Sequence, residues 1–285
     1  MDTKFVKSPL NYIGNKYRLL PQIEVYFPKN IGKMVDLFCG GCDVTINTQA
    51  ELKYANDINS IIIDMFKTFQ GYDKKYILEY IAETIEKRQL SRTNKESFLA
   101  FREYYNQTCN PLDLFVLMCY SFNYQFRFNS KHEYNSSFGK NKSQYSETTK
   151  RNLEILLDRI KDVNFTSKEF QDFDYSILNK GDFLYADPPY LISCGPYNDG
   201  KRGFKDWDEQ QERDLYAILD NLNKQGVFFA LSNVMEHKGL KNEILLDWCK
   251  ENDYIVHDLT YAYNHSNYHS KNTDKVTREV LITNY

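Results

Sequence analysis

Residues 33–57 hold the pattern that most restricts the fold of this chain. An apolar run over residues 33–38 (KMVDLF) leads into Cys39-Gly40-Gly41, which predicts a buried strand followed by a glycine turn. A helix is expected over residues 44–50, and a second strand over residues 52–55 that ends at Asn56-Asp57. An acidic residue about 20 positions beyond the first strand, after a glycine turn, is the layout of a nucleotide-binding βαβ unit. The chain is therefore expected to form an α/β fold around a parallel sheet.

Strand-like and helical patterns divide the rest of the chain. Further strands are expected at residues 163–166, 182–186, 226–232, 254–259 and 278–283. Residues 60–120 instead carry apolar side chains at three- and four-residue spacing, which is typical of helices. We therefore expect one sheet domain, residues 1–60 and 151–285, interrupted by a mainly helical domain, residues 61–150. Residues 121–145, rich in Asn and Ser, are expected as a hairpin or a long exposed loop.

Several global features favour a cytoplasmic location. No run of about 18 apolar residues is present, so no membrane span is expected. Residues 1–4 lack the apolar core of a signal peptide, and the six cysteines do not resemble a secreted disulfide framework. Cys39 and Cys42 form a CxxC pair, but no second pair follows at zinc spacing. We therefore expect no metal, with a redox or metal role for this pair as the minor alternative.

The charge distribution says more than the formal net charge of −3. Residues 120–151 contain six basic and only two acidic side chains, a local excess that favours phosphate binding, although a solvated loop would have the same composition. The chain also contains 23 Tyr and 19 Phe. Aromatic faces suit stacking on nucleobases, although an AT-biased genome would produce a similar excess.

The segment with the clearest chemical meaning is Tyr185-Ala186-Asp187-Pro188-Pro189-Tyr190. Neither proline has an N–H, so the strand ladder ends there and the chain continues as a rigid, extended turn. Asp187 and Tyr190 are thereby expected at the carboxyl end of a central strand, where open α/β sheets bind ligands. A carboxylate, the Pro188 carbonyl and an aromatic plane together suit a flat base with an amino group. A purely structural turn fits less well beside a nucleotide-binding pattern.

Four segments together resemble the alpha-class (D12, Dam-like) DNA adenine-N6 methyltransferases. Residues 187–190 (DPPY) match the family's signature in the form typical of adenine-N6 enzymes. Residues 11–16 (NYIGNK), 36–41 (DLFCGG) and 56–59 (NDIN) are similar to its N-terminal cofactor motif, glycine loop and ribose-binding motif. The resemblance covers essentially the whole chain. It implies a Rossmann-like S-adenosylmethionine-dependent methyltransferase sheet with an inserted, mainly helical target-recognition domain.

The resemblance also implies roles in a cofactor site. Asp57 would accept hydrogen bonds from the ribose hydroxyls of S-adenosyl-L-methionine, unless it only caps the following turn or helix. Lys16 would pair with the methionine carboxylate, unless it is an ordinary surface lysine. The other residues expected at the cofactor are Tyr12, Asp36, Phe38, Cys39, Gly40, Phe170 and Asp187.

For catalysis, the resemblance implies direct methyl transfer to a flipped adenine. Asp187 and the Pro188 carbonyl would accept the two N6 hydrogens and favour a tetrahedral nitrogen, while Tyr190 would stack on the base. No Pro-Cys dipeptide occurs, so the covalent step of cytosine-C5 enzymes is not expected. Residues 191–206 form either a loop that closes over the flipped base or an ordinary loop.

Residues 122–129 and 135–140 are similar to the base-reading hairpin of Dam-like enzymes. The residues expected to contact DNA are Asn123, Tyr124, Arg127 and Lys140. Among these, Arg127 is predicted to bind guanine, and Tyr124 to fill the gap left by the extruded base. Lys140 stands where Dam-like enzymes carry Arg, and Lys is the poorer bidentate reader, so a GATC target is not expected. The predicted partner is double-stranded DNA, with a cognate restriction endonuclease as a second candidate.

Two other classes of function account for fewer of these features. RNA-adenine and cytosine-N4 methyltransferases more often carry Asn or Ser in place of Asp187. A DNA-binding module without activity would not need the complete set of catalytic residue types. Site-specific DNA adenine-N6 methylation is therefore the expected function.

Overall fold

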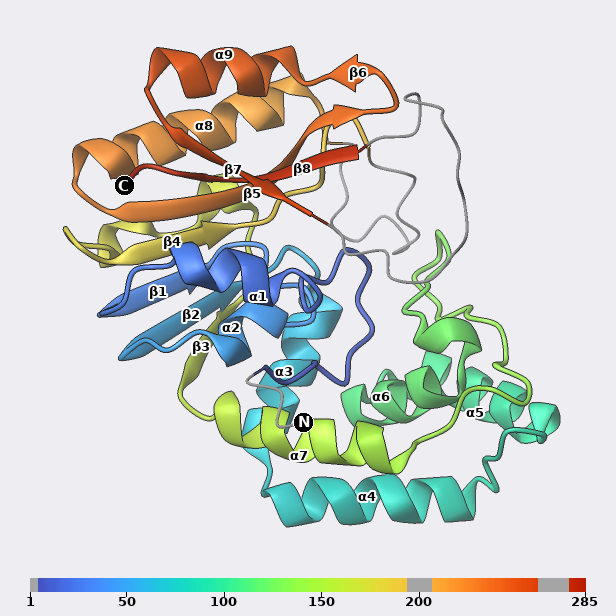
Figure 1. The fold of residues 1–285 in the computed structure, drawn as a ribbon. Coiled ribbons are helices and arrows are strands. Elements are labelled where there is room, and N and C mark those ends of the chain that lie inside the picture. Colours follow the sequence, from blue (N-terminus) through green and yellow to red (C-terminus); the bar gives the residue numbers. More distant parts are fainter. Residues whose placement is uncertain (1–4, 194–206, 261–276) are drawn as a thin grey trace.

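A twisted sheet with helices on both faces forms the larger part of the molecule in the computed structural model (Figure 1), which describes residues 5–193, 207–260 and 277–285. Within these residues the sheet has eight strands, in the order β3-β2-β1-β4-β5-β8-β7 with the short β6 beside β5. The strands are β1 Lys33–Asp36, β2 Leu52–Asn56, β3 Val163–Thr166, β4 Phe183–Ala186, β5 Phe228–His237, β6 Leu240–Lys241, β7 Ile255–Leu259 and β8 Thr277–Thr283. The helices are α1 Leu20–Ile23, α2 Asp43–Asn47, α3 Ser60–Gly71, α4 Lys74–Lys87, α5 Lys95–Thr108, α6 Pro111–Tyr120, α7 Glu147–Arg159, α8 Glu209–Lys224 and α9 Glu243–Glu251.

The strand order makes the fold Rossmann-like. Strands β3, β2, β1, β4 and β5 are parallel, and the chain winds one way from β1 to β3 and the other way from β4 to β5. The reversal between β1 and β4 leaves a crevice at the carboxyl ends of these two strands, which is the usual ligand position in such sheets. Both strands end at motifs singled out in the sequence, the glycine turn after β1 and Asp187 after β4.

Two sequence expectations are wrong in detail. The sheet is not entirely parallel, because β8 runs antiparallel to both β5 and β7. Residues 260–276 lack the apolar spacing of a crossover helix, and a parallel connection would require one. The helix expected over residues 44–50 ends at Asn47, since Thr48 is already extended. The Asn47 side chain bonds to both the N–H and the carbonyl of Val6, which fixes the chain where it turns toward β2.

The central strand β4 sends alternate side chains into two different cores. Phe183 and Tyr185 pack in a cluster that includes Leu20 of α1. Leu184 and Ala186 lie in the cluster beneath α8 and α9. This alternation follows from the period-two geometry of a strand, and burial on both faces explains why β4 reads as an unbroken apolar run. Rigid packing on both faces fixes the position of Asp187, the residue that follows the strand.

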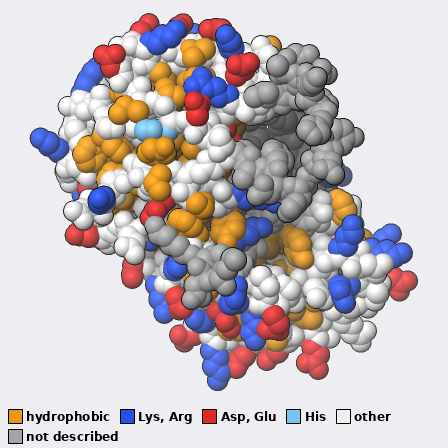
Figure 2. Space-filling model, viewed as in Figure 1, with side chains coloured by type: hydrophobic (Ala, Val, Ile, Leu, Met, Phe, Trp, Pro, Cys, Tyr) orange, Lys and Arg blue, Asp and Glu red, His pale blue; other side chains and the backbone are white. Residues whose placement is uncertain are grey.

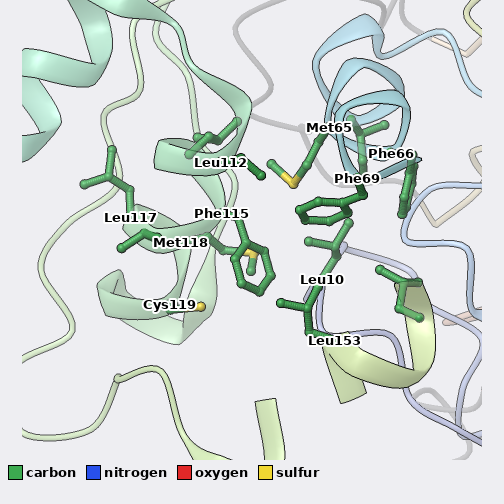
Figure 3. Close-up of a cluster of buried hydrophobic side chains, with 14 of the residues drawn as sticks. Leu10, Met65, Phe66, Phe69, Leu112, Phe115, Leu117, Met118, Cys119 and Leu153 are labelled. Atoms are coloured by element: carbon green, nitrogen blue, oxygen red, sulfur yellow. The ribbon is translucent and has the colours of Figure 1, made fainter. Parts of the chain in front are cut away.

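The helical block α3–α7 shares a hydrophobic core with the sheet. Figure 3 shows side chains of α3, including Met65 and Phe69, meeting those of the fully buried helix α6, including Phe115. Phe66 of α3 stacks on Phe165 of β3 with ring centroids 4.9 Å apart, so the block is joined to the sheet by packing as well as by the chain. In the view of Figure 2, charged side chains of both signs cover the helical block, whereas apolar side chains gather over the sheet.

Candidate active site

One pocket opens at the carboxyl ends of β1, β2 and β4, where the strand order reverses. All residues predicted for cofactor binding and catalysis line it: Tyr12, Lys16, Asp36, Phe38, Cys39, Gly40, Asp57, Phe170, Asp187, Pro188 and Tyr190. They come from segments more than a hundred residues apart in the sequence, and the sheet brings them together. The residues predicted to contact DNA are not part of this lining.

The glycine turn lines the pocket and is held from two sides. The Cys39 N–H donates to the Asn56 carbonyl at 2.8 Å, which joins the turn to β2. The Gly40 N–H donates to Oδ2 of Asp57 at 2.8 Å, and the Asn59 N–H donates to Oδ1 of the same carboxylate at 2.9 Å. Asp57 therefore shapes the turn through backbone donors, in addition to lining the pocket.

Asp36 contributes an unusual buried carboxylate to the pocket wall. Its Oδ2 accepts hydrogen bonds from the backbone N–H and the hydroxyl of Thr45, whereas its buried Oδ1 has no hydrogen-bond partner among the described residues. Burial raises the pKa of Asp36 to about 7, although the Thr45 hydrogen bonds lower it. A buried acceptor without a partner is costly, so a ligand with a cationic or N–H group would be stabilised here.

The carboxylate of Asp187 lies in a buried charged cluster at the other wall. Lys16 Nζ is 2.7 Å from Asp187 Oδ2 and 3.8 Å from Oε1 of Glu279. The Tyr190 hydroxyl lies 3.0 Å from Asp187 Oδ1 and 3.0 Å from the same Glu279 oxygen, and its single proton can serve only one of them at a time. Burial raises the pKa of Asp187, while Lys16 and the Tyr190 hydroxyl lower it. Lys16 is thus a counter-ion of Asp187, not the surface lysine considered as the alternative.

The residues of this region that the sequence analysis missed include Glu279 and Trp207. Glu279 is 5% exposed and belongs to β8, where it stands between Arg278 and Val280 and belongs to no recognisable motif. Trp207 also lines the pocket, and it lies in the chain just before α8. The capping-box residues Asp208 and Gln211 mark the start of that helix in the sequence, but nothing local links Trp207 to a ligand.

The predicted base-reading segment is a loop held by scattered bridges. The isolated bridges Ser121–Phe138 and Phe128–Tyr134 connect its two sides, and the hydroxyls of Tyr134 and Ser136 donate to the Gln125 carbonyl across the loop. Arg127, Lys140 and Asn123 are exposed, as a reader of DNA requires. Tyr124 is instead half-buried against the helical core.

A direct hydrogen bond connects this loop to the cofactor-motif segment. Asn11 precedes the pocket residue Tyr12, and its side-chain amide donates to the Asn123 carbonyl at 2.8 Å. Asn123 and Tyr124 both have positive φ, 53° and 56°, a backbone conformation that costs free energy in residues other than glycine. The loop is therefore held in a strained conformation next to the pocket.

The expectations for the CxxC pair, a metal site, a membrane span and the closing loop remain. Cys39 and Cys42 are buried free thiols whose pKa values are raised mainly by burial, which disfavours the thiolate needed for redox or metal chemistry. In residues 5–193, 207–260 and 277–285 no group of three or more His, Cys, Asp or Glu side chains is placed to hold a metal ion.

The same residues contain no helix with the length and apolarity of a membrane span. The proposed closing loop lies outside the described residues from position 194 to 206.

Comparison with known proteins adds a family and several relatives. Residues 12–274 match the family model of the D12 class N6 adenine-specific DNA methyltransferases. The chain is 48% identical over 283 residues to the type II methyltransferase M.FokI of Planomicrobium okeanokoites, covering 99% of this chain and 43% of the relative. It is 49% identical over 284 residues to the modification methylase StsI of Streptococcus sanguinis, again covering 99% and 43%. The modification methylase LlaI of Lactococcus lactis subsp. lactis is 31% identical over 281 residues, with 98% and 43% covered. The chain thus spans less than half the length of these relatives.

Proposed function

The chain belongs to the D12 class of N6 adenine-specific DNA methyltransferases, and we propose that it transfers a methyl group from S-adenosylmethionine to the N6 amino group of an adenine in duplex DNA. The observation that carries this proposal is a pocket lined both by Asp187, Pro188 and Tyr190 and by the glycine turn between β1 and α2. RNA and cytosine-N4 are disfavoured as targets because the family is adenine-specific and acts on DNA.

The pocket fits S-adenosylmethionine on three structural grounds. The unpartnered Oδ1 of Asp36 suits the α-ammonium group. A Cβ added to Gly40 would lie 2.8 Å from Tyr12, so only a glycine leaves room at this wall. Phe38 and Phe170 offer aromatic faces to the adenine ring, and the carboxylate of Asp57, which already accepts two backbone hydrogen bonds, has further lone pairs that could accept from ribose hydroxyls. When bound, this cofactor supplies an electrophilic methyl group on a sulfonium.

The chain's own residues would then activate and position the target base. The Asp187 carboxylate and the Pro188 carbonyl accept the two hydrogens of N6 and draw its lone pair out of conjugation, so they stabilise the transition state more than the ground state. Lys16 opposes the effect of burial and favours the ionised, accepting form of Asp187. The ring of Tyr190 provides a stacking face, while its hydroxyl is engaged by Asp187 and Glu279. We assign Lys16 primarily to Asp187, although a cofactor carboxylate remains compatible with its charge.

We assign DNA recognition to the helical insertion, residues 61–150, and in particular to its exposed loop. Arg127 and Lys140 carry positive charge, which phosphates and guanine edges attract, and Asn123 is exposed in the same loop. Phe122 is 47% exposed, whereas Tyr124 is half-buried, so Phe122 is the aromatic better placed to fill the gap left by a flipped base. M.FokI is named a type II methyltransferase and StsI a modification methylase, so we propose that this chain protects DNA from a cognate endonuclease.

Substitution of Arg127 by alanine is expected to relax sequence preference. Loss of a bidentate guanine contact should remove about 1–3 kcal/mol of discrimination at one base pair. The measurement compares kcat/KM on the cognate site with that on sites changed at each position. The matched control is Lys131→Ala in the same exposed loop, which should weaken DNA binding equally for all sequences. Unchanged discrimination in Arg127→Ala would remove this residue from base reading.

The proposed function is tested by expressing the gene in a host without DNA methylation and mapping modified bases across the genome. We expect N6-methyladenine within one short sequence context. Methylation found only at cytosine N4, or only in RNA, would contradict the assignment of the target.

A further inference from the structure

Three aromatic side chains from three separate elements meet at one side of the pocket. Phe38 follows β1, Phe170 begins the short helical turn Phe170–Asp172, and Trp207 precedes α8. The Trp207 ring centroid lies 5.8 Å from that of Phe38 and 5.4 Å from that of Phe170, while Phe38 and Phe170 are 5.7 Å apart. All three line the pocket, so they form a continuous aromatic wall.

A buried carboxylate fixes the orientation of the Trp207 ring. The indole N–H donates to Oε2 of Glu212, a side chain with 0% exposure. The other carboxylate oxygen accepts hydrogen bonds from the Tyr216 hydroxyl and from the amides of Asn233 and Asn242, the last two at 2.9 Å. Glu212 thereby joins α8 to β5 and to the start of α9. Because charged hydrogen bonds of this kind are strong, the indole is tied to the rigid part of the fold.

Because the indole N–H already donates to Glu212, Trp207 would contact a ligand in the pocket through the face or edge of its ring. A flat, aromatic ligand group is the chemistry that such a wall recognises. The target adenine is a less suitable occupant, because the groups assigned to it, Asp187 and Tyr190, belong to the separate cluster around Lys16 and Glu279. Asn56 further fixes the segment before Phe170 by bonding to both the N–H and the carbonyl of Lys168.

We propose that Trp207 is a cofactor-contacting residue that completes the subsite for the adenine ring of S-adenosylmethionine, and that Glu212 is the positioning residue that holds its indole. This inference rests on the proposed function, since it requires that the pocket accept this cofactor. It adds a third ring to Phe38 and Phe170 in the aromatic wall.

The chain's tryptophan content makes the proposal directly measurable. Only two tryptophans are present, Trp207 and Trp248. Trp248 is 7% exposed, stacks on Tyr216 with centroids 4.1 Å apart, and donates its indole N–H to Asp220. Trp248 is not part of the pocket lining. Trp248→Phe therefore isolates the emission of Trp207, and Trp207→Phe isolates that of Trp248.

The experiment titrates each variant with S-adenosylhomocysteine, following tryptophan emission and, separately, heat of binding. We expect a saturable change of emission in Trp248→Phe and none in Trp207→Phe. Trp207→Ala should weaken binding by about tenfold, the order expected for loss of one aromatic stacking face. Should Trp248→Phe fail to fold, the difference between wild type and Trp207→Phe gives the same emission signal.

A double-mutant cycle tests the role of Glu212. Glu212→Gln should weaken binding in the presence of Trp207 but add no further loss in the Trp207→Ala background, and it should lower the emission anisotropy of Trp207. A merely structural role would weaken binding equally in both backgrounds. If wild type does not bind the ligand at all, the proposed function fails and the inference with it. If wild type binds, but Trp207→Ala binds equally well and the emission of Trp207 is unchanged, the inference alone is overturned.

Discussion

Asp187→Asn is expected to reduce methyl transfer by at least about 100-fold, the scale observed when a preorganised group that stabilises a transition state is removed. The substitution keeps the size of the side chain but replaces a charged acceptor by an amide, which offers only one accepting oxygen. Positive charge developing on N6 then loses its carboxylate partner. The measurement is single-turnover methylation of a duplex containing the cognate site, with cofactor affinity determined separately by calorimetry.

A control at the opposite end of the same strand separates chemistry from stability. Asp182 precedes β4, is 8% exposed, and accepts hydrogen bonds from the backbone N–H groups of Lys33 and Asn179. Asp182→Asn should lower the free energy of unfolding but leave turnover by the folded enzyme nearly unchanged. Asp187→Asn should instead lose most of its turnover even in the folded enzyme, with cofactor affinity nearly retained because Asp36 and the aromatic wall are intact. Normal turnover by Asp187→Asn would exclude its carboxylate from the reaction.

Local patterns in the sequence predicted the positions of most strands, while the family resemblance supplied residues such as Tyr12, Lys16 and Phe170 that line the pocket. The strand over Val163–Thr166 is confirmed without change, and the expected second strand differs from β2 by one residue. The prolines after Ala186 end β4 where expected, which places Asp187 at the carboxyl end of the sheet. These features succeed because period-two burial and proline stereochemistry act within a few residues.

What the sequence did not predict depends on contacts between distant segments. The pairing of Lys16 with Asp187 joins positions 171 residues apart, and the Glu279–Tyr190 contact depends on how β8 is inserted between β5 and β7. Trp207 lines the pocket, and its indole N–H donates to the buried carboxylate of Glu212. Such arrangements are fixed by tertiary packing, which leaves no periodic or motif signal at the residues concerned.

Gly40→Ala is expected to weaken S-adenosylhomocysteine binding by about tenfold or more, equivalent to at least about 1.4 kcal/mol. Gly40 has a φ of +46°, and a Cβ at this position would lie 2.8 Å from Cδ1 and 3.1 Å from Cε1 of the Tyr12 ring. The Tyr12 ring would therefore be displaced at the wall of the pocket, next to the glycine turn. The Cβ also adds backbone strain of about 1–2 kcal/mol in the left-handed region. Calorimetric titration measures the affinity, and thermal unfolding measures the strain.

The two effects of the added methyl group can be separated with a second glycine. Gly239 has a φ of +83°, lies between β5 and β6, and has no atom within 4 Å of a Cβ built on it. Gly239→Ala should therefore destabilise the fold through strain alone and leave cofactor affinity unchanged. A larger loss of affinity in Gly40→Ala at similar destabilisation would then be due to the contact with Tyr12. Equal affinities in the two variants would mean that the pocket tolerates movement of Tyr12, and the cofactor would have to be bound mainly by the aromatic wall and the carboxylates of Asp36 and Asp57.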